Sequence, residues 1–438
     1  MNVTDRGMGL ALGTLRRLAA LEVLDRLGIR ERTERAVHTA TRNGARAAGA
    51  ASRPFVAASK RARPARPQPS RSKGLFDLTP TDEQQMLQAA FGDFGLERLR
   101  PAALEADDEA AAPKELLDQS IELGALMLAV PSELGGVVEE RSTVTSVLAG
   151  EALARGDMGL AVACLAPAAV SNALALWGDA DQQATYLGEF VGEHPPAAAL
   201  AINEPQPLFD PTRLQTRGRL DGGDLVLTGG KSLVPRASAA ELFLVGAEVE
   251  GRGPALVLVE SGTDGVLVEP EPAMGIRAAA TATLTLEDVR VPAGAVLGDG
   301  APEVYAECVQ RARLAWCAMA TGTSQAVLDY VIPYVNQRET FGEPISHRQS
   351  VAFAISDMAI ELEGLRLATY RAASLADRKQ PFAREVAWAR QLATTKAMQI
   401  GADGVQLLGG HGFVKEHPVE RWYRDLRACG LMEGALLV

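Results

Sequence analysis

Hydrophobic residues follow two different patterns along the chain, and the pattern changes twice. Long stretches dominated by Ala and Leu run from Thr79 to about His194 and predict helices. Between Ala197 and Pro292 the hydrophobic runs become short, rich in β-branched residues, and separated by Gly, Asp or Pro turns, which predicts strands. Helical stretches of Ala, Leu and Met resume after Pro302. The sequence therefore predicts helices, then a β-sheet, then helices again.

Local signals locate several of these elements. Thr81 followed by Asp82 and Glu83 is a helix start, and residues 131–136 read as a loop between helices. Five segments are predicted as strands: 225–228, 242–245, 255–259, 283–286 and 289–292. We expect an α+β multidomain fold with an N-terminal helical domain at 76–196, an antiparallel β-barrel or sandwich at 197–298, and a C-terminal helical bundle at 299–438.

The first 75 residues differ from the rest. Leucines at mostly three-residue spacing between Gly9 and Ile29 predict a short amphipathic helix, and four prolines between Ala51 and Lys73 predict an extended linker. This segment, 1–75, carries 16 Lys/Arg against 5 Asp/Glu. A docking or solvated extension and binding to an acidic membrane surface or partner both remain open for this basic arm.

Composition narrows the function classes. With 438 residues, 47% hydrophobic and 23% charged, the chain is long enough for two to four globular units. The net charge is −11, so the body beyond the arm is strongly acidic, which argues against nucleic acid as a ligand. Four cysteines stand singly and suggest no disulfide framework, so we expect a reducing, cytoplasmic location.

Four short motifs follow one another in the C-terminal region. They are Arg338-Glu339-Thr340-Phe341-Gly342 with Gln349 behind it, Gln406 to Phe413 with three glycines, Pro418 to Asp425, and Met432-Glu433-Gly434. In this order and spacing the chain resembles the acyl-CoA dehydrogenase family, over roughly 79–438. The resemblance implies FAD as cofactor, an acyl-CoA as substrate, an electron-transferring flavoprotein as acceptor, and assembly into oligomers.

The first two motifs suit a phosphate-bearing ligand. Gly409 and Gly410 lack Cβ atoms, so their backbone N–H groups can approach a pyrophosphate, and Arg338 supplies a fixed positive charge. The resemblance implies that these elements reach a neighbouring subunit's FAD, and it assigns cofactor contacts to Arg338, Phe341, Gln349, Gln406, Gly409 and Gly410. The alternative is a loop between helices that needs positive φ, with Arg338 merely solvated.

Oxidising an acyl-CoA between Cα and Cβ requires a base for the α-proton. Glu433 stands among apolar neighbours, a setting that would raise its basicity, and the resemblance implies this role for it. The alternative is a surface Glu in a loop. The resemblance also implies that Arg313 lies beside the carboxylate and that Met432 and Gly434 flank the substrate. Some family branches carry the base one residue before this Arg, where this chain has Ala312.

The middle region departs from the family. Its flavin motif reads Asn203-Glu204-Pro205-Gln206-Pro207-Leu208-Phe209-Asp210, without the usual glycines and serine, and a second element reads Lys231-Ser232-Leu233-Val234-Pro235, without the usual Trp and Thr. We expect backbone groups around Asn203 and Val234 to hold flavin, and Phe209 to contact substrate. The sequence shows no metal-ligand spacing.

Three hypotheses follow from these departures. In the first, the chain is an acyl-CoA dehydrogenase with altered middle-domain contacts, in a homo-oligomer. In the second, it is one subunit of a heteromer with a paralogous chain and completes the partner's FAD site while its own site is weakened. In the third, it kept the fold and lost the chemistry.

Overall fold

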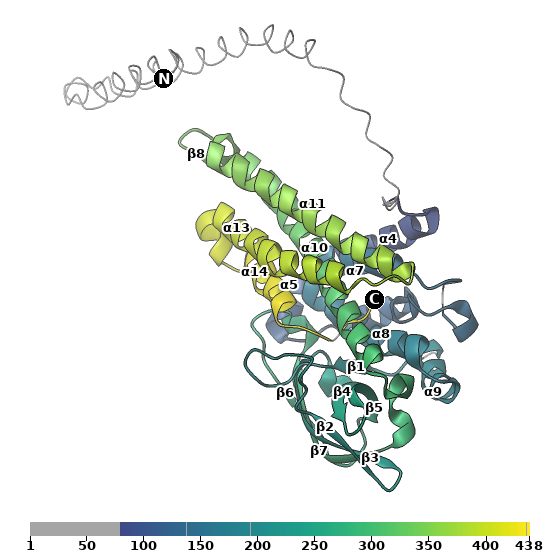
Figure 1. Ribbon diagram of the computed structural model, residues 1–438. Helices are drawn as coiled ribbons and strands as arrows, with labels where there is room; N and C mark the ends of the chain where they lie inside the picture. The colour runs from purple at the N-terminus through teal and green to yellow at the C-terminus, as the bar shows by residue number, and fades with distance from the viewer. Residues whose placement is uncertain (1–78, 137, 193, 435) are drawn as a thin grey trace, which may run out of the picture. The chain divides into compact units, whose positions relative to one another are not determined.

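The chain runs from helices into a β-sheet and back into helices, in the order the sequence predicts (Figure 1). The computed structural model describes residues 79–438 apart from 137, 193 and 435. These residues belong to one unit, Phe76–Val438. The predicted amphipathic helix and the proline-rich linker of the basic arm lie outside the described residues.

The first part of the unit is helical. Thr81 caps its first helix: the Thr81 Oγ1 accepts a hydrogen bond from Gln84 N at 3.2 Å, and Gln84 Oε1 accepts one from Thr81 N at 3.0 Å. The predicted helix start is therefore confirmed. The helices are α4 (Asp82–Phe94), α5 (Arg100–Glu109), α6 (Lys114–Glu122), α7 (Thr143–Gly156), α8 (Met158–Trp177) and α9 (Ala180–Tyr186).

Helix α8 is apolar along its whole length. By length and composition alone it could cross a membrane, but 83% of its most apolar stretch of 18 residues is buried within the fold. Its side chains join two hydrophobic clusters, one shared with the C-terminal helices and one shared with the β-sheet. Burial on all sides explains why no polar face appears in its sequence, as expected for a helix inside a core.

The middle part is a sheet of seven strands. They are β1 (Ala198–Ala201), β2 (Arg217–Asp221), β3 (Asp224–Val234), β4 (Leu242–Val249), β5 (Gly253–Glu260), β6 (Val266–Pro270) and β7 (Ala282–Pro292). The order across the sheet is β1-β4-β2-β3-β7-β6, with β5 paired to β4. Two predicted segments, 283–286 and 289–292, are a single strand, because a bulge beside Asp288 (φ 53°) shifts the register without ending the strand.

This sheet is mixed and not purely antiparallel. Strand β4 pairs in parallel with β1 and with β2, and the other pairs are antiparallel. The short strand β1 was missed in the sequence because it has four residues, three of them alanines, which have low strand propensity. All four residues of β1 are buried. The loop that follows begins at Ile202, which packs in the core between α8 and the sheet.

The last part is a bundle around one long helix. Helix α10 (Pro302–Gln337) packs against α7, α11 (Gln349–Asp377), α12 (Ala383–Leu392), α13 (Met398–Leu408) and α14 (Val419–Leu426). Figure 1 shows α10 and α11 side by side, with the hairpin of β8 (Glu339–Thr340) and β9 (Glu343–Pro344) at the end away from the sheet.

Buried polar side chains join the three parts. Arg421 Nε of α14 donates to Asp157 Oδ2, the cap of α8, at 2.9 Å, and both side chains are buried. Asp425 Oδ1 accepts from Ile276 N of the middle part at 2.6 Å. Burial, together with the nearby charge of Asp157, raises the pKa of the Asp425 carboxyl to about 8. The sheet is thus fixed to the C-terminal helices through polar groups that water does not reach.

Candidate active site

The Glu433 carboxylate is buried. Its partners come from the C-terminal helices α10 and α12, and its backbone contacts the loop after β1. Arg313 of α10 donates through Nε to Glu433 Oε2. Arg390 of α12 donates through Nη2 to Glu433 Oε1 at 2.8 Å. Each carboxylate oxygen is therefore held by one guanidinium group, and the two groups come from different helices.

The expected apolar setting of Glu433 is wrong. Its neighbours in sequence are apolar, but folding brings the guanidinium groups of Arg313 and Arg390 to its side chain. Arg313 lies beside the carboxylate, as the resemblance implies. The sequence analysis missed Arg390, because this residue lies far upstream of Glu433 and belongs to no motif. A charged side chain beside Ala389 on α12 is the one available signal in the sequence.

The backbone on either side of Glu433 is held as well. Glu433 N donates to Asn203 Oδ1 at 3.0 Å, and Asn203 Nδ2 donates to Leu431 O at 2.7 Å. Arg390 Nη1 donates to Met432 O, and Trp316 Nε1 donates to Gly434 O, each at 2.9 Å. Asn203, Met432 and Gly434 therefore meet at Glu433, and the Asn203 side chain is engaged in positioning the Glu433 loop.

The residue after Asn203, Glu204, forms a buried ion pair. Lys231 Nζ lies 2.8 Å from Glu204 Oε1, and the two side chains are 0% and 3% exposed. Glu204 also accepts hydrogen bonds from the backbone N–H groups of Gln215 and Thr216 at 2.7 and 2.9 Å. Burial lowers the pKa of Lys231 to about 8 although Glu204 opposes that shift. Glu204 and Lys231 belong to the two altered motifs of the middle part. Their ion pair holds the loop after β1 against β3.

One of the residues predicted to hold the chain's own flavin, Val234, has its side chain inside the protein. The Val234 side chain is buried in the sheet core, so only its backbone can reach a ligand. Its neighbour Leu233 has φ 52° and lines an apolar crevice with Met274, Ile276 and Met432. Phe209 is half-buried against the cluster between α8 and the sheet. The middle part thus offers a narrow hydrophobic slot beside Met432.

A second, open site lies on the C-terminal helices. A groove with a volume of about 380 Å³ is lined by Tyr334, Arg338, Thr340, Ile345 and residues 406–411. The groove brings together four of the predicted cofactor residues: Arg338, Gln406, Gly409 and Gly410. Arg338 is exposed and makes no ion pair with any described residue. Phe341 and Gln349 are exposed on the nearby hairpin and at the start of α11, outside the groove lining.

Two glycines of this loop, Gly409 and Gly412, stand where a side chain would be strained or would not fit. Gly409 has φ 59° and ψ −132°, a conformation that only glycine adopts readily. A Cβ at Gly412 would lie 2.2 Å from Val405 O. At Gly410 an added Cβ would meet nothing within 4 Å, so the backbone there faces open space. The loop is therefore both tightly folded and accessible to a ligand.

Two histidines support this loop. Tyr334 Oη and His411 Nδ1 lie 2.9 Å apart, Tyr330 Oη and His417 Nδ1 lie 2.7 Å apart, and the two imidazole rings stack with centroids 5.4 Å apart. The cluster ties the glycine loop to α10. In the part of the chain that the structure describes, no group of three or more His, Cys, Asp or Glu side chains could hold a metal ion.

Comparison with known proteins agrees with the order of the three parts. Family models described as the N-terminal, middle and C-terminal domains of acyl-CoA dehydrogenase match residues 81–193, 199–289 and 298–436. The mitochondrial short-chain specific acyl-CoA dehydrogenase of Bos taurus is 33% identical over 365 residues, which cover 81% of this chain and 87% of that protein.

Solved structures give the same result. Butyryl-CoA dehydrogenase of Megasphaera elsdenii has a TM-score of 0.76 and 29% identity, covering 82% of this chain and 96% of that one. A structure of PigA with FAD and proline has a TM-score of 0.76 and 25% identity, with the same coverage. The chain therefore belongs to the acyl-CoA dehydrogenase family, whose members are FAD-dependent oxidoreductases that act on CH–CH bonds.

Proposed function

We propose that this chain oxidises an acyl-CoA thioester between Cα and Cβ, with Glu433 as the base that removes the α-proton. The observation that carries the proposal is the Glu433 carboxylate, buried between the loop after β1 and the C-terminal helices and oriented by Arg313 and Arg390. FAD, when bound, accepts the hydride that leaves Cβ. Loss of the α-proton to Glu433 and of the hydride from Cβ turns the substrate into the α,β-unsaturated thioester and leaves Glu433 protonated.

The two arginines leave Glu433 able to act. A carboxylate has about four lone-pair sites on its two oxygens, and each guanidinium takes one site on one oxygen. A free lone pair therefore remains on each oxygen to receive a proton. With the flanking backbone held by Asn203 and Trp316, the carboxylate keeps one orientation, which reduces the entropy lost on reaching the transition state.

The described residues fit the cofactor in two places. The outer groove suits the adenosine diphosphate half, because Arg338 is free to pair with a phosphate and the backbone at Gly410 is accessible. The slot beside Leu233, Met274 and Met432 suits the edge of a flat ring system. Electrons would pass on to an electron-transferring flavoprotein. We also propose a cytoplasmic location, since all four cysteines are buried and unpaired.

A heteromeric arrangement is the second candidate. It is favoured by the contrast between the groove, which keeps the family's residues, and the middle part, where Leu233 replaces the Trp and Gln206 and Leu208 replace the two glycines. In that arrangement the groove completes a paralogous partner's FAD site, and the chain's own site is weak.

The flavin content of the purified protein separates these candidates. One FAD per chain that butyryl-CoA reduces under anaerobic conditions supports the homo-oligomer, and flavin retained only after co-expression with a paralogue supports the heteromer. Glu433→Gln should lower the rate of flavin reduction by about 10³-fold or more, since the amide cannot accept the proton. Glu416→Gln, at an exposed position, is the control. A homogeneous, folded protein that never takes up FAD would refute the proposal.

A further inference from the structure

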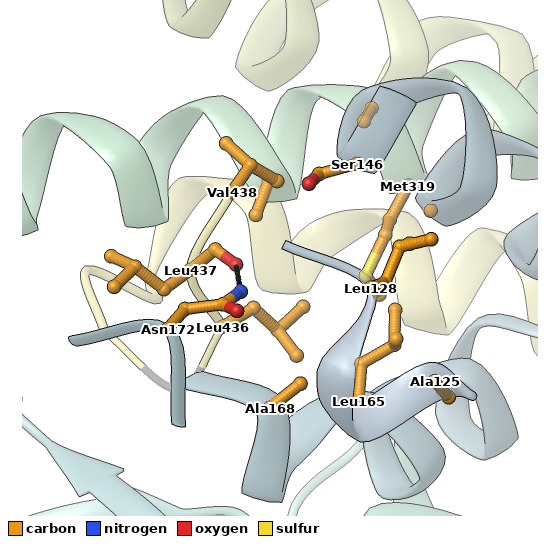
Figure 2. A pocket seen from close by; sticks show the side chains of 13 residues that line it. Ala125, Leu128, Ser146, Leu165, Ala168, Asn172, Met319, Leu436, Leu437 and Val438 are labelled. Carbon is orange, nitrogen blue, oxygen red and sulfur yellow. Dashed lines mark hydrogen bonds between the residues drawn. The ribbon is translucent and has the colours of Figure 1, made fainter. Parts of the chain in front are cut away.

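Two hollows border the segment 431–438, and they differ in charge. The first is a cavity of about 30 Å³ between α7, α8 and α10. Figure 2 shows Leu165 and Met319 on one side of this cavity and residues 436–438 on the other. None of the described residues that line it is charged. A ligand in this cavity would therefore meet no charged side chain.

The second hollow is the hydrophobic slot beside Met432, with a volume of about 60 Å³. Its apolar walls include Leu233, Leu431 and Met432, and Met432 directly precedes Glu433. The Asn203 side chain bonds both to Leu431 O, at 2.7 Å, and to Glu433 N, at 3.0 Å. The slot and the proposed base are therefore held together by one short segment of the chain.

Two arginines also line the slot, and their charges are compensated differently. Arg424 donates to both carboxylate oxygens of Asp107 and to both of Glu420, at 2.8 to 3.1 Å. Arg427 is half-buried and donates through Nη2 to Tyr423 Oη at 2.7 Å, and its guanidinium carbon lies 4.8 Å from the centroid of the Tyr423 ring. No carboxylate of a described residue forms an ion pair with Arg427, so its charge is the uncompensated one in the slot lining.

We infer that Arg427 binds the edge of the flavin ring that enters this slot and stabilises the negative charge that the ring gains on reduction. This inference rests on the proposed function and adds a residue to its cofactor site. A hydride brings two electrons and one proton, so the ring that accepts it becomes more negative by one charge. A cation beside that charge favours the reduced form, and apolar walls strengthen the effect because the effective dielectric constant is lower there than in water.

Glu271, directly after β6, provides a comparison of opposite charge. Glu271 Oε2 accepts a hydrogen bond from Leu233 N at 2.6 Å, and Glu271 Oε1 accepts one from Ser232 Oγ at 2.8 Å. These bonds hold Leu233 at φ 52°, the conformation in which it lines the slot. The Glu271 carboxylate is thus bonded to a residue of the slot wall, and its negative charge should disfavour the reduced ring. Neutralising Glu271 and neutralising Arg427 should therefore have effects of opposite sign.

The reduction potential of FAD bound to the full chain tests this role apart from catalysis. It is measured by reduction with dithionite in the presence of a redox dye, so no acyl-CoA is needed. Arg427→Gln should weaken the preference for reduced over oxidised FAD about tenfold, which lowers the potential of a two-electron couple by about 30 mV. Arg427→Met, which keeps a long side chain, takes its place if the Gln variant does not fold, and Arg427→Lys should keep most of the preference.

Two further variants complete the experiment. Glu271→Gln should raise the potential, because the amide oxygen can still accept from Leu233 N but the negative charge is gone. Arg384→Gln is the matched control and should leave the potential unchanged. Arg384 is also an arginine stacked on an aromatic ring, 4.9 Å from the centroid of Trp388, but it is not among the residues that line the slot.

The possible outcomes separate this inference from the proposed function. An unchanged potential in Arg427→Gln overturns the inference, and so do shifts of the same sign in Arg427→Gln and Glu271→Gln; the proposed function then stands if butyryl-CoA still reduces the bound flavin. The expected shifts in a protein whose flavin butyryl-CoA does not reduce would support the role of Arg427 and refute the proposed reaction. A folded chain that takes up no FAD overturns both.

Discussion

The outer groove and the Glu433 site contrast in almost every physical respect. At the groove, Arg338, Gln406, Gly409 and Gly410 are exposed, and the Arg338 guanidinium pairs with no described residue. At Glu433 the polar groups are buried and paired with one another. The groove residues are therefore open to solvent and to a ligand, whereas the polar residues around Glu433 are part of the folded core.

This contrast has a consequence for mutations. A substitution in the groove should change cofactor retention and leave the stability of the folded chain almost unchanged. A substitution at the Glu433 site should change both, because removing one member of a buried ionic group leaves the others without partners. The following predictions test this separation, in order of decreasing effect.

The largest effect is expected when both arginines of the Glu433 site are replaced. Arg313→Gln or Arg390→Gln alone leaves Glu433 one cation and should lower the free energy of unfolding by about 1–2 kcal/mol. The double variant leaves a buried carboxylate without a cation and should lose about 5 kcal/mol, more than the sum of the single changes. Urea denaturation monitored by circular dichroism measures these differences.

Adding Glu433→Gln to that double variant is the control, since a neutral amide needs no cation. It should restore most of the lost stability. Additive single and double effects, or no restoration in the triple variant, would show that the pairing does not stabilise the folded state.

The pH dependence of stability tests Asp425, which is raised to a pKa of about 8 by burial and by the charge of Asp157. The unfolded carboxyl has the ordinary value of 3.8. Between these values the folded chain binds a proton that the unfolded chain has lost, so this group's stabilising contribution is complete below pH 4 and disappears as the pH rises to 8. Asp425→Asn should remove this decline, which amounts to at most about 1.4 kcal/mol per pH unit.

Thermal melts of the two proteins at pH 5, 6, 7 and 8 provide the comparison, with exposed Asp264→Asn as the matched control. As the pH increases, the melting temperature of the Asp425→Asn protein should rise relative to that of the unmodified protein. A constant difference across this range would mean that Asp425 is ionised throughout.

In the groove, Arg338→Gln should weaken FAD binding roughly tenfold, the value of one charge-assisted hydrogen bond to a phosphate. The melting temperature of the flavin-free protein should stay the same, because Arg338 makes no ion pair with a described residue. FAD titration followed by flavin fluorescence measures the affinity, and exposed Arg213→Gln is the control. A lower melting temperature with unchanged FAD affinity would show that Arg338 stabilises the fold and does not bind the cofactor.

The smallest effect concerns Phe341, which is 96% exposed and has φ 55°. Such a backbone is unfavourable for a residue with a side chain, so Phe341→Gly should raise the free energy of unfolding by roughly 0.5–1 kcal/mol. The same change should reduce FAD retention if the exposed ring contacts a neighbouring subunit's cofactor. Differential scanning calorimetry and flavin absorbance after gel filtration give the two readings. Loss of stability would indicate that the ring serves this chain's own fold.

Much of the fold could be predicted from the sequence because its determinants are local. The capping box at Thr81 and the turn residues between strands act over a few residues, so the helix–sheet–helix order follows from them. The parallel pairing of β1 and β2 with β4 could not be predicted in this way. It joins strands that are far apart in the chain, and nothing in either strand's own residues specifies the partner.

At the Glu433 site the sequence determined the identity of the base candidate and of Arg313, through a motif whose spacing is local. Only the tertiary structure brought Arg390 and Asn203 to the same carboxylate, and only packing placed Leu436–Val438 in the cavity between the helices. Electrostatic surroundings and free volume depend on side chains from several distant elements at once. For this reason an apolar run around Glu433 predicted a hydrophobic setting, and folding produced an ionic one.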